Sequence, residues 1–179
     1  MTAWGYMRPE LMQPCAQDGF ATLSMCKPQI RKQARCGDVV VAYRVDPQRS
    51  NVKLSMKPAI SFIGIVYAVL PMDKYMGNRN QLFISRKDNL YSPEGSRVKP
   101  TTNYDKKHWR YSGLSEERVI ERDWGGKNVL VFKEYVDVSR NVGRVHNQYE
   151  FRRIWNRVLE EPHFDAGDKS RRGHRLYRI

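Results

Sequence analysis

One apolar run, Ala59–Leu70 ("AISFIGIVYAVL"), restricts most strongly what this chain can fold into. Its 12 residues are too few to cross a bilayer, because a membrane-spanning helix needs about 20 apolar residues. The run is rich in β-branched and aromatic residues, so it predicts a long buried strand. A chain of 179 residues can bury a core of ordinary size around such a strand.

The other periodic segments predict a mixture of strands and helices. Further strands are expected at 4–7, Gly19–Met25, Asp38–Val45 and Asn128–Tyr135. Helices are expected at Pro28–Arg35, Met72–Met76, Ser115–Arg122 and Gln148–Glu160. Because the strands outnumber the helices and do not alternate regularly with them, the pattern argues against a doubly wound parallel sheet. We expect an α+β fold, with a mixed, curled or barrel-like sheet and peripheral helices.

The domain boundary is predicted from the C-terminal composition. Residues 1–162 are expected to form a single domain, and residues 163–179 a basic, flexible tail. The segment 77–110 is rich in loop signals, and loops of that length inside a domain are often functional.

The charge indicates a class of partner. The chain has 32 basic and 19 acidic residues, a formal net charge of +13. This balance favours a polyanion, with nucleic acid or a nucleotide as the first candidate. The alternative is a basic protein without such a partner. The cations gather in the segments 27–35, 97–110, 139–157 and 163–179.

Cysteine and histidine usage predicts neither a disulfide framework nor a metal site. The three cysteines, at positions 15, 26 and 36, include no CxxC pair. The four histidines, at positions 108, 146, 163 and 174, do not have metal-ligand spacing. No signal peptide or membrane segment is indicated at the N-terminus. We therefore expect an intracellular protein, cytoplasmic or nucleoid-associated, with no metal, cofactor or membrane partner.

The predicted helix 28–35 concentrates positive charge in a short space. Pro28 suits a first helical turn, so Lys27 would stand beside free backbone N–H groups that favour an anion. Helical spacing would place Arg31 and Arg35 on the same face as Lys27, with Ile30 turned toward the core. This arrangement suits a phosphate group. A surface helix with solvated charges is the alternative.

The same stretch carries a family resemblance. The segment "GFATLSMCKPQIRKQARCGDVVVAY" and the later "KDNLY" and "VLVFKEYVDVS" resemble the nucleotide modification associated domain 2 family. The matching residues are Gly19, Phe20, Thr22, Leu23, Cys26, Lys27, Pro28, Ile30, Arg31, Gly37, Asp38, Asp88, Asn89 and Tyr91. The chain departs from the pattern at Val39, where the family has tryptophan, and at Lys133 and Glu134 in the closing strand.

The resemblance implies an association with systems that make, remove or sense modified bases. It also implies a likeness to the PUA-like folds, which often hold a base in a pocket. Fold alone does not decide function, so the choice between a binder and a catalyst stays open at this point.

Five residues of the central loops are candidate ligand contacts. Asp88 and Asn89 offer hydrogen-bonding groups suited to a base edge, although an Asx turn would use the same groups. Tyr91 and Trp109 could stack on a base or pack the loops. His108 could act as a base, or be an ordinary surface histidine.

Two further residues are expected to be structural. Cys26 ends a strand, where a cysteine is more often a small buried hydrophobe than a nucleophile. Asp38 opens a strand and is expected to cap the preceding turn or pair with Arg31 or Arg35.

The sequence favours a binding module that recognises a modified base, with phosphate contacts from Lys27, Arg31 and Arg35. An enzyme acting on a base or nucleotide is the alternative, with Lys27 as base or nucleophile and Asp88 or Asp38 as the acid. A nucleic-acid contact without base preference is a third possibility.

Overall fold

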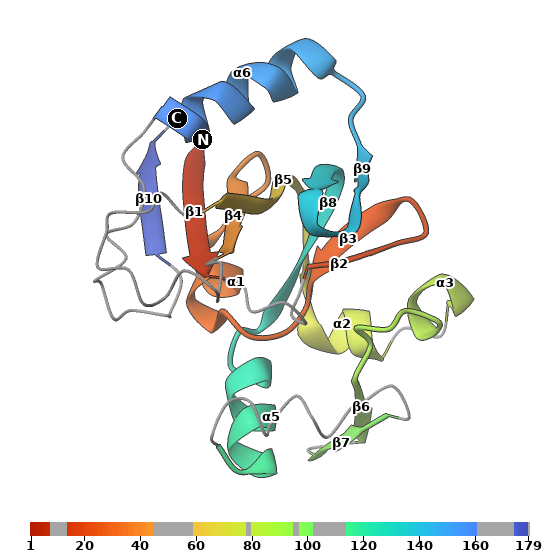
Figure 1. Ribbon diagram of the computed structural model, residues 1–179. Helices are drawn as coiled ribbons and strands as arrows, with labels where there is room; N and C mark the ends of the chain where they lie inside the picture. Colours follow the sequence, from red (N-terminus) through yellow and green to blue (C-terminus); the bar gives the residue numbers. More distant parts are fainter. Residues whose placement is uncertain are drawn as a thin grey trace.

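Eight strands form one mixed sheet (Figure 1). The computed structural model describes residues 1–7, 14–44, 59–77, 80–94, 97–101, 114–160 and 174–178. The strands are β1 (Thr2–Met7), β2 (Cys15–Gln17), β3 (Phe20–Leu23), β4 (Val39–Arg44), β5 (Ala59–Pro71), β8 (Asn128–Asp137), β9 (Val142–Arg144) and β10 (His174–Arg178). Their order is β10-β1-β4-β5-β8-β3-β2, with β9 also paired to β8. Strands β1 and β4 are parallel, and the other neighbours are antiparallel.

The predicted α+β class with a mixed sheet and peripheral helices is confirmed. The expected barrel-like closure is wrong for the described part of the chain. Closure requires the two edge strands to exchange backbone hydrogen bonds. The sheet instead ends at β10 on one side and at β2 on the other.

Strand β5 is the long strand that the apolar run predicts. It pairs with β4 on one side and β8 on the other, and most of its first half is buried. Phe62 meets the ring of Phe132 from β8 edge to face, with centroids 5.4 Å apart. A Cβ at Gly64 would lie 2.8 Å from Phe132 and 2.9 Å from Phe62, so glycine permits this ring packing.

The two faces of the sheet bury separate apolar clusters, which follows from the alternation of side chains along a strand. From β4, Val40 belongs to the cluster that includes Ile30 of helix α1 (Pro28–Gln33). Val41 belongs to the cluster that packs against helix α6 (Gln148–Glu160). Helices α1 and α6 therefore lie against opposite faces.

A third apolar cluster lies beyond the end of β5. It is built from helix α2 (Met72–Met76), helix α5 (Glu116–Trp124) and a hairpin of β6 (Tyr91–Glu94) with β7 (Arg97–Pro100). Figure 1 shows these elements together on one side of the sheet, with helix α3 (Gln81–Ile84) beside α2. A short 3-10 helix, η2 (Val138–Arg140), joins β8 to β9.

Several predicted boundaries agree with the structure. Helices α2 and α6 have the predicted bounds, and the Ser115 side chain caps α5 by accepting the Arg118 N–H. Residues 174–178, within the stretch expected to be a tail, form β10 and pair with β1. No helix among the described residues is long and apolar enough to span a membrane.

Candidate functional site

A turn with unusual backbone geometry joins β3 to α1. Cys26 and Lys27 both have positive φ, 51° and 45°, a left-handed conformation that non-glycine residues adopt at a cost of about 1 kcal/mol or more. Lys27 precedes Pro28, which disfavours the right-handed helical conformation at this position. Two successive residues in this conformation persist only where neighbouring groups hold them.

Asp123, at the C-terminal end of α5, is one of those groups. Its Oδ1 accepts the backbone N–H of Cys26 at 2.8 Å, and its Oδ2 accepts the Tyr91 hydroxyl at 2.9 Å. Both Asp123 and Tyr91 are fully buried. The carboxylate therefore ties the Cys26–Lys27 turn to α5 and to the β6–β7 hairpin.

Arg31 holds the turn from the other side. Its guanidinium donates to the carbonyl oxygens of Ser24 (2.7 Å), Cys26 (2.8 Å), Asn128 (2.9 Å) and Asp123. The residue is 0% exposed, so the prediction of an exposed cationic stripe is wrong for Arg31. The physical reason is that four carbonyls from three parts of the chain converge on this guanidinium and replace water. Burial lowers the pKa of Arg31 to about 10, which still leaves it charged at neutral pH.

Lys27, Cys26 and Arg122 meet at the surface of this turn, and we call these three residues the Lys27 surface. The Lys27 Nζ lies 4.9 Å from the centroid of the Tyr6 ring, as in a cation–π contact. One Arg122 Nη lies 3.7 Å from the Cys26 Sγ, and the Arg122 side chain is 28% exposed. Burial lowers the pKa of Lys27, the charge of Arg122 lowers it further, and Cys26 acts in the opposite direction.

Asp88, a predicted base-reading residue, lies in a closed polar cluster. Its carboxylate accepts hydrogen bonds from the Thr22 hydroxyl, from the Tyr75 hydroxyl at 2.9 Å and from the Arg86 Nε at 3.2 Å. Asp88 and Arg86 are both fully buried, and Arg86 also donates to the Cys15 carbonyl at 2.8 Å. This cluster fastens the loop after α3 to the β2–β3 hairpin.

Ser24 connects this cluster to the turn. Its hydroxyl donates to the Asp88 carbonyl at 3.1 Å, and its own carbonyl accepts from Arg31. Asn89, the next residue, is buried and donates its amide to the Phe83 carbonyl at 3.1 Å. The structure therefore joins Arg31, Asp88 and Tyr91, which are all buried, through one hydrogen-bond network that holds the turn of the partly exposed Lys27.

The remaining predicted residues lie elsewhere. Arg35 is exposed beyond the end of α1. Asp38 accepts the backbone N–H groups of Arg35 (3.0 Å) and Thr2 (2.8 Å), so its predicted structural role is confirmed. His108 and Trp109 lie outside the described residues.

Sequence reasoning missed Asp123 and Arg122. Both come from the end of a helix that was predicted only as a structural element, and their partners lie more than 90 residues away in the chain. The one sequence signal for these two residues was "RDWGG", in which a charged pair and a tryptophan precede two glycines. By itself this pattern is typical of an ordinary helix end.

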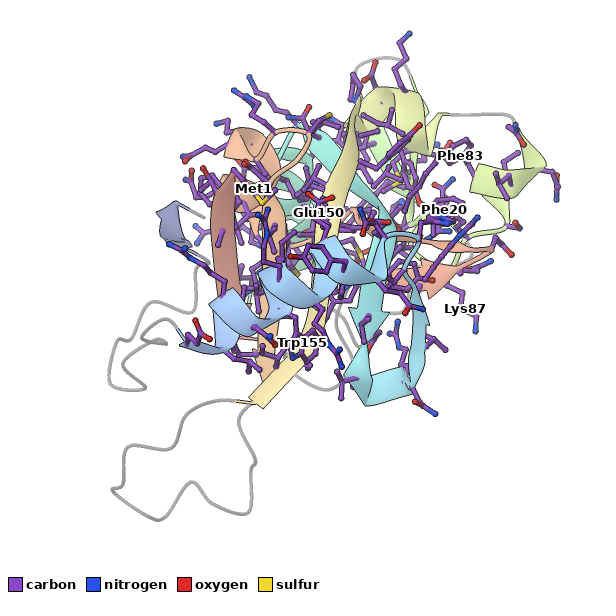
Figure 2. All side chains as sticks on the ribbon, turned by 90° about the horizontal axis from the view of Figure 1, so that it is seen from above. Met1, Phe20, Phe83, Lys87, Glu150 and Trp155 are labelled. Carbon is purple, nitrogen blue, oxygen red and sulfur yellow. The ribbon has the colours of Figure 1, made fainter. Side chains whose placement is uncertain are left out.

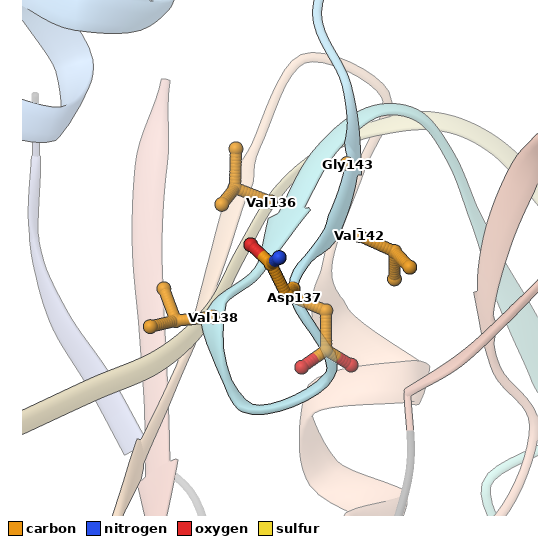
Figure 3. Close-up of a pocket in the computed structure, with 6 residues that line it drawn as sticks. Val136, Asp137, Val138, Val142 and Gly143 are labelled. Atoms are coloured by element: carbon orange, nitrogen blue, oxygen red, sulfur yellow. The ribbon is translucent and has the colours of Figure 1, made fainter.

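A different feature, an open pocket of about 260 Å³, lies at the opposite end of β8 (Figure 3). It is lined by Val136, Asp137, Val138, Asn141, Val142 and Gly143. The Asp137 carboxylate is already occupied by the Ser139 hydroxyl at 2.6 Å and by Arg140 at 3.6 Å. Because its one carboxylate is committed, this pocket is a weaker candidate than the Lys27 surface. The described residues contain no group of three or more His, Cys, Asp or Glu side chains that could hold a metal ion.

Comparison with known proteins gives one finding. The model of the family described as nucleotide modification associated domain 2 matches residues 11–151, more than three quarters of the 179-residue chain. No curated protein and no solved structure matches the chain.

Proposed function

Because this chain belongs to the nucleotide modification associated domain 2 family, we propose that it binds a nucleotide unit at the Lys27 surface. The unit is a modified base with its phosphate, within nucleic acid or free. The observation that carries the proposal is the meeting of Lys27 and Arg122 beside Cys26, at a strained and partly exposed turn.

The phosphate would contact Lys27 and Arg122. Both side chains are only partly buried. They bring two positive charges to one turn, where the Asp123 carboxylate lies 3.5 Å from the Arg122 Nε and offsets part of this charge. Cations that are already partly desolvated attract an anion more strongly than fully solvated ones do. The contacts predicted for Arg35, His108 and Trp109 remain predictions. The likeness to PUA-like folds also remains a prediction.

The buried residues have a different role in this proposal. Arg31, Asp123 and Tyr91 position the turn through hydrogen bonds of 2.7 to 2.9 Å. Asp88 and Asn89 stabilise the loop next to it. Preorganisation of this kind lowers the entropic cost of binding, because the ligand does not have to order the turn.

The test is a binding measurement with a short labelled oligonucleotide that carries one 5-substituted pyrimidine, against its unmodified twin, at two salt concentrations. We expect a preference for the modified oligonucleotide that survives at high salt. Lys27→Ala should weaken the binding of both oligonucleotides, because both carry the phosphate that Lys27 would contact. The matched control is Lys133→Ala, because the Lys133 Nζ also lies over a tyrosine ring, 3.8 Å from the Tyr67 centroid. Equal losses in the two variants would contradict the proposal.

A second candidate function follows from the lowered pKa of Lys27. A lowered pKa gives a lysine a larger fraction of neutral amine at a given pH, and the neutral amine can act as a base or nucleophile on a base or nucleotide. Asp38 and Asp88 are committed to other hydrogen bonds, and Asp123 is the carboxylate bonded to this turn. Lys27→Arg distinguishes the functions, since it keeps the charge but not the neutral amine. If it retained binding but abolished a change in oligonucleotide mass, the chain would be an enzyme.

A further inference from the structure

The outward face of α6 carries a concentration of arginine that the Lys27 surface does not use. Helix α6 buries Phe151, Ile154 and Val158 against the sheet. Its exposed residues include Tyr149, Arg152, Arg153, Asn156 and Arg157. Figure 2 looks onto this helix, with Glu150 and Trp155 labelled on it. We call Tyr149, Arg152, Arg153 and Arg157 the α6 face.

Two of the acidic residues near this face are used to build the start of the helix, and a third, Glu160, lies at its end, one turn after Arg157. Glu150 and Asn147 cap it reciprocally: the Asn147 Oδ1 accepts the Glu150 N–H at 3.0 Å, and the Asn147 amide donates to Glu150 at 3.4 Å. Glu134 accepts the N–H groups of His146 and Asn147, both at 3.0 Å. Residues 151–159 contain three arginines and no acid. Within the described part of the chain, the side chains of Arg152 and Arg153 make no hydrogen bond or ion pair.

Tyr149 gives the face a second property. It is 82% exposed, the highest value among the large apolar side chains of the described residues. It lies one helical turn from Arg152 and Arg153, since residues three and four apart are neighbours on a helix. An exposed ring beside arginines fits a polymer that presents phosphates and unstacked bases together.

We propose that the α6 face is a second nucleic-acid contact, which binds the sugar-phosphate backbone of a polymer. From Tyr149 to Arg157 the face extends about 12 Å along the helix, at about 1.5 Å per residue. One strand of a duplex carries three or four phosphates over this length, at about 3.4 Å each. The inference rests on the proposed function for the class of ligand, and adds that the ligand is a polymer rather than a free nucleotide.

The position of the face makes it separable from the Lys27 surface. Lys27 lies over Tyr6, which belongs to the apolar cluster on the α1 side of the sheet. Helix α6 covers the other cluster. The family match ends at residue 151, so most of α6 also lies outside it. A variant of the α6 face should therefore leave contacts at Lys27 unchanged.

The experiment compares wild-type chain with Arg152→Ala/Arg153→Ala, using a single-stranded oligonucleotide and the free nucleotide with the same base. The control is Lys74→Ala/Lys87→Ala, which removes two exposed charges from α2 and the loop after α3. We expect the arginine variant to bind the oligonucleotide about fivefold to tenfold more weakly, with the slope of log K against log salt reduced by about 1.4. Its affinity for the free nucleotide should not change, and the control should keep the wild-type slope.

The outcomes separate the two proposals. An equal loss in the control, or an unchanged slope in the arginine variant, would overturn the role of the α6 face. Loss of binding to phosphatidylserine vesicles without loss of oligonucleotide binding would also overturn it, and would indicate a lipid surface instead. If wild-type chain showed no preference for a modified base while the slope still depended on Arg152 and Arg153, the proposed function would fail and this inference would stand.

Discussion

The guanidinium of Arg31 lies where a side chain at residue 126 would have to be. A Cβ built on Gly126 would come within 2.8 Å of the Arg31 Nε and closer still to its Cζ. Arg31 cannot move away cheaply, because its guanidinium donates to four backbone carbonyls. The glycine is therefore part of the arrangement that holds the Cys26–Lys27 turn.

Gly126→Ala should reduce the free energy of unfolding by about 2 kcal/mol, as overpacking of a closed site usually does. Urea unfolding followed by circular dichroism measures the effect. Gly125→Ala is the neighbouring comparison and should cost less. Gly125 has ordinary helical φ and ψ of −58° and −18°, and its added Cβ would lie 3.0 Å from the Glu121 carbonyl oxygen, a tight contact that a shift of a few tenths of an ångström relieves. An equally small cost for both substitutions would show that Arg31 can move.

Asp88→Asn should destabilise the fold by about 3 kcal/mol, because it removes the charge that pairs with a fully buried Arg86. The same hydrogen-bonding cluster includes Tyr75 and Thr22, whose hydroxyls would lose an anionic acceptor. Thermal and urea unfolding measure the loss, with Asp73→Asn as the control on the exposed first turn of α2. A selective loss of ligand affinity with unchanged stability would instead restore Asp88 as a base-reading residue.

The sequence predicted the local elements well and the long-range contacts poorly. The long strand β5 and helices α2 and α6 could be predicted because their apolar periodicity is local. The burial of Arg31 could not, since its acceptors at Asp123 and Asn128 lie 92 and 97 residues away. Sequence spacing alone placed Arg31 on the same face as Lys27 and Arg35, but α1 ends at Gln33 and its cap Ala34 is extended.

At the candidate site, too, the sequence predicted what depends on neighbouring residues and missed what depends on distant ones. Lys27 was identified because proline and positive charge mark a helix start within a few residues. Asp88 was identified as a polar loop residue, but its burial depends on Arg86 and on Thr22, 66 residues earlier in the chain. A short motif therefore located the right loop without distinguishing a ligand contact from a structural acceptor.

Lys27 should react with an amine reagent faster near pH 8 in the wild-type chain than in Arg122→Ala. Burial and the charge of Arg122 lower the pKa of Lys27, so a larger fraction of its amine is neutral and nucleophilic at that pH. Competitive labelling with a trace of acetic anhydride, read by peptide mass spectrometry across a pH series, gives the pKa of each lysine. Arg122→Ala should raise the pKa of Lys27 toward its ordinary value. A Lys27 amine that titrated at the ordinary value for lysine would remove the basis for a catalytic lysine.

The stability of the chain should fall between about pH 9 and 11, in part because of Cys15. Burial, together with the negative charge of Asp88, raises the pKa of this thiol from 9.0 to about 11. The folded state therefore keeps a proton that the unfolded state releases above pH 9, so the stabilisation is fully present below that pH and is lost as the pH rises through 11.

Cys15→Ala should remove about 2 kcal/mol of this pH dependence, whatever it does to the stability at neutral pH. Urea unfolding under reducing conditions across that range measures it, with Cys36→Ala as the control, since Cys36 is exposed. If the two variants kept the same slope of unfolding free energy against pH, Cys15 would be solvated in the folded chain, and the polar cluster around Asp88 would be open to water.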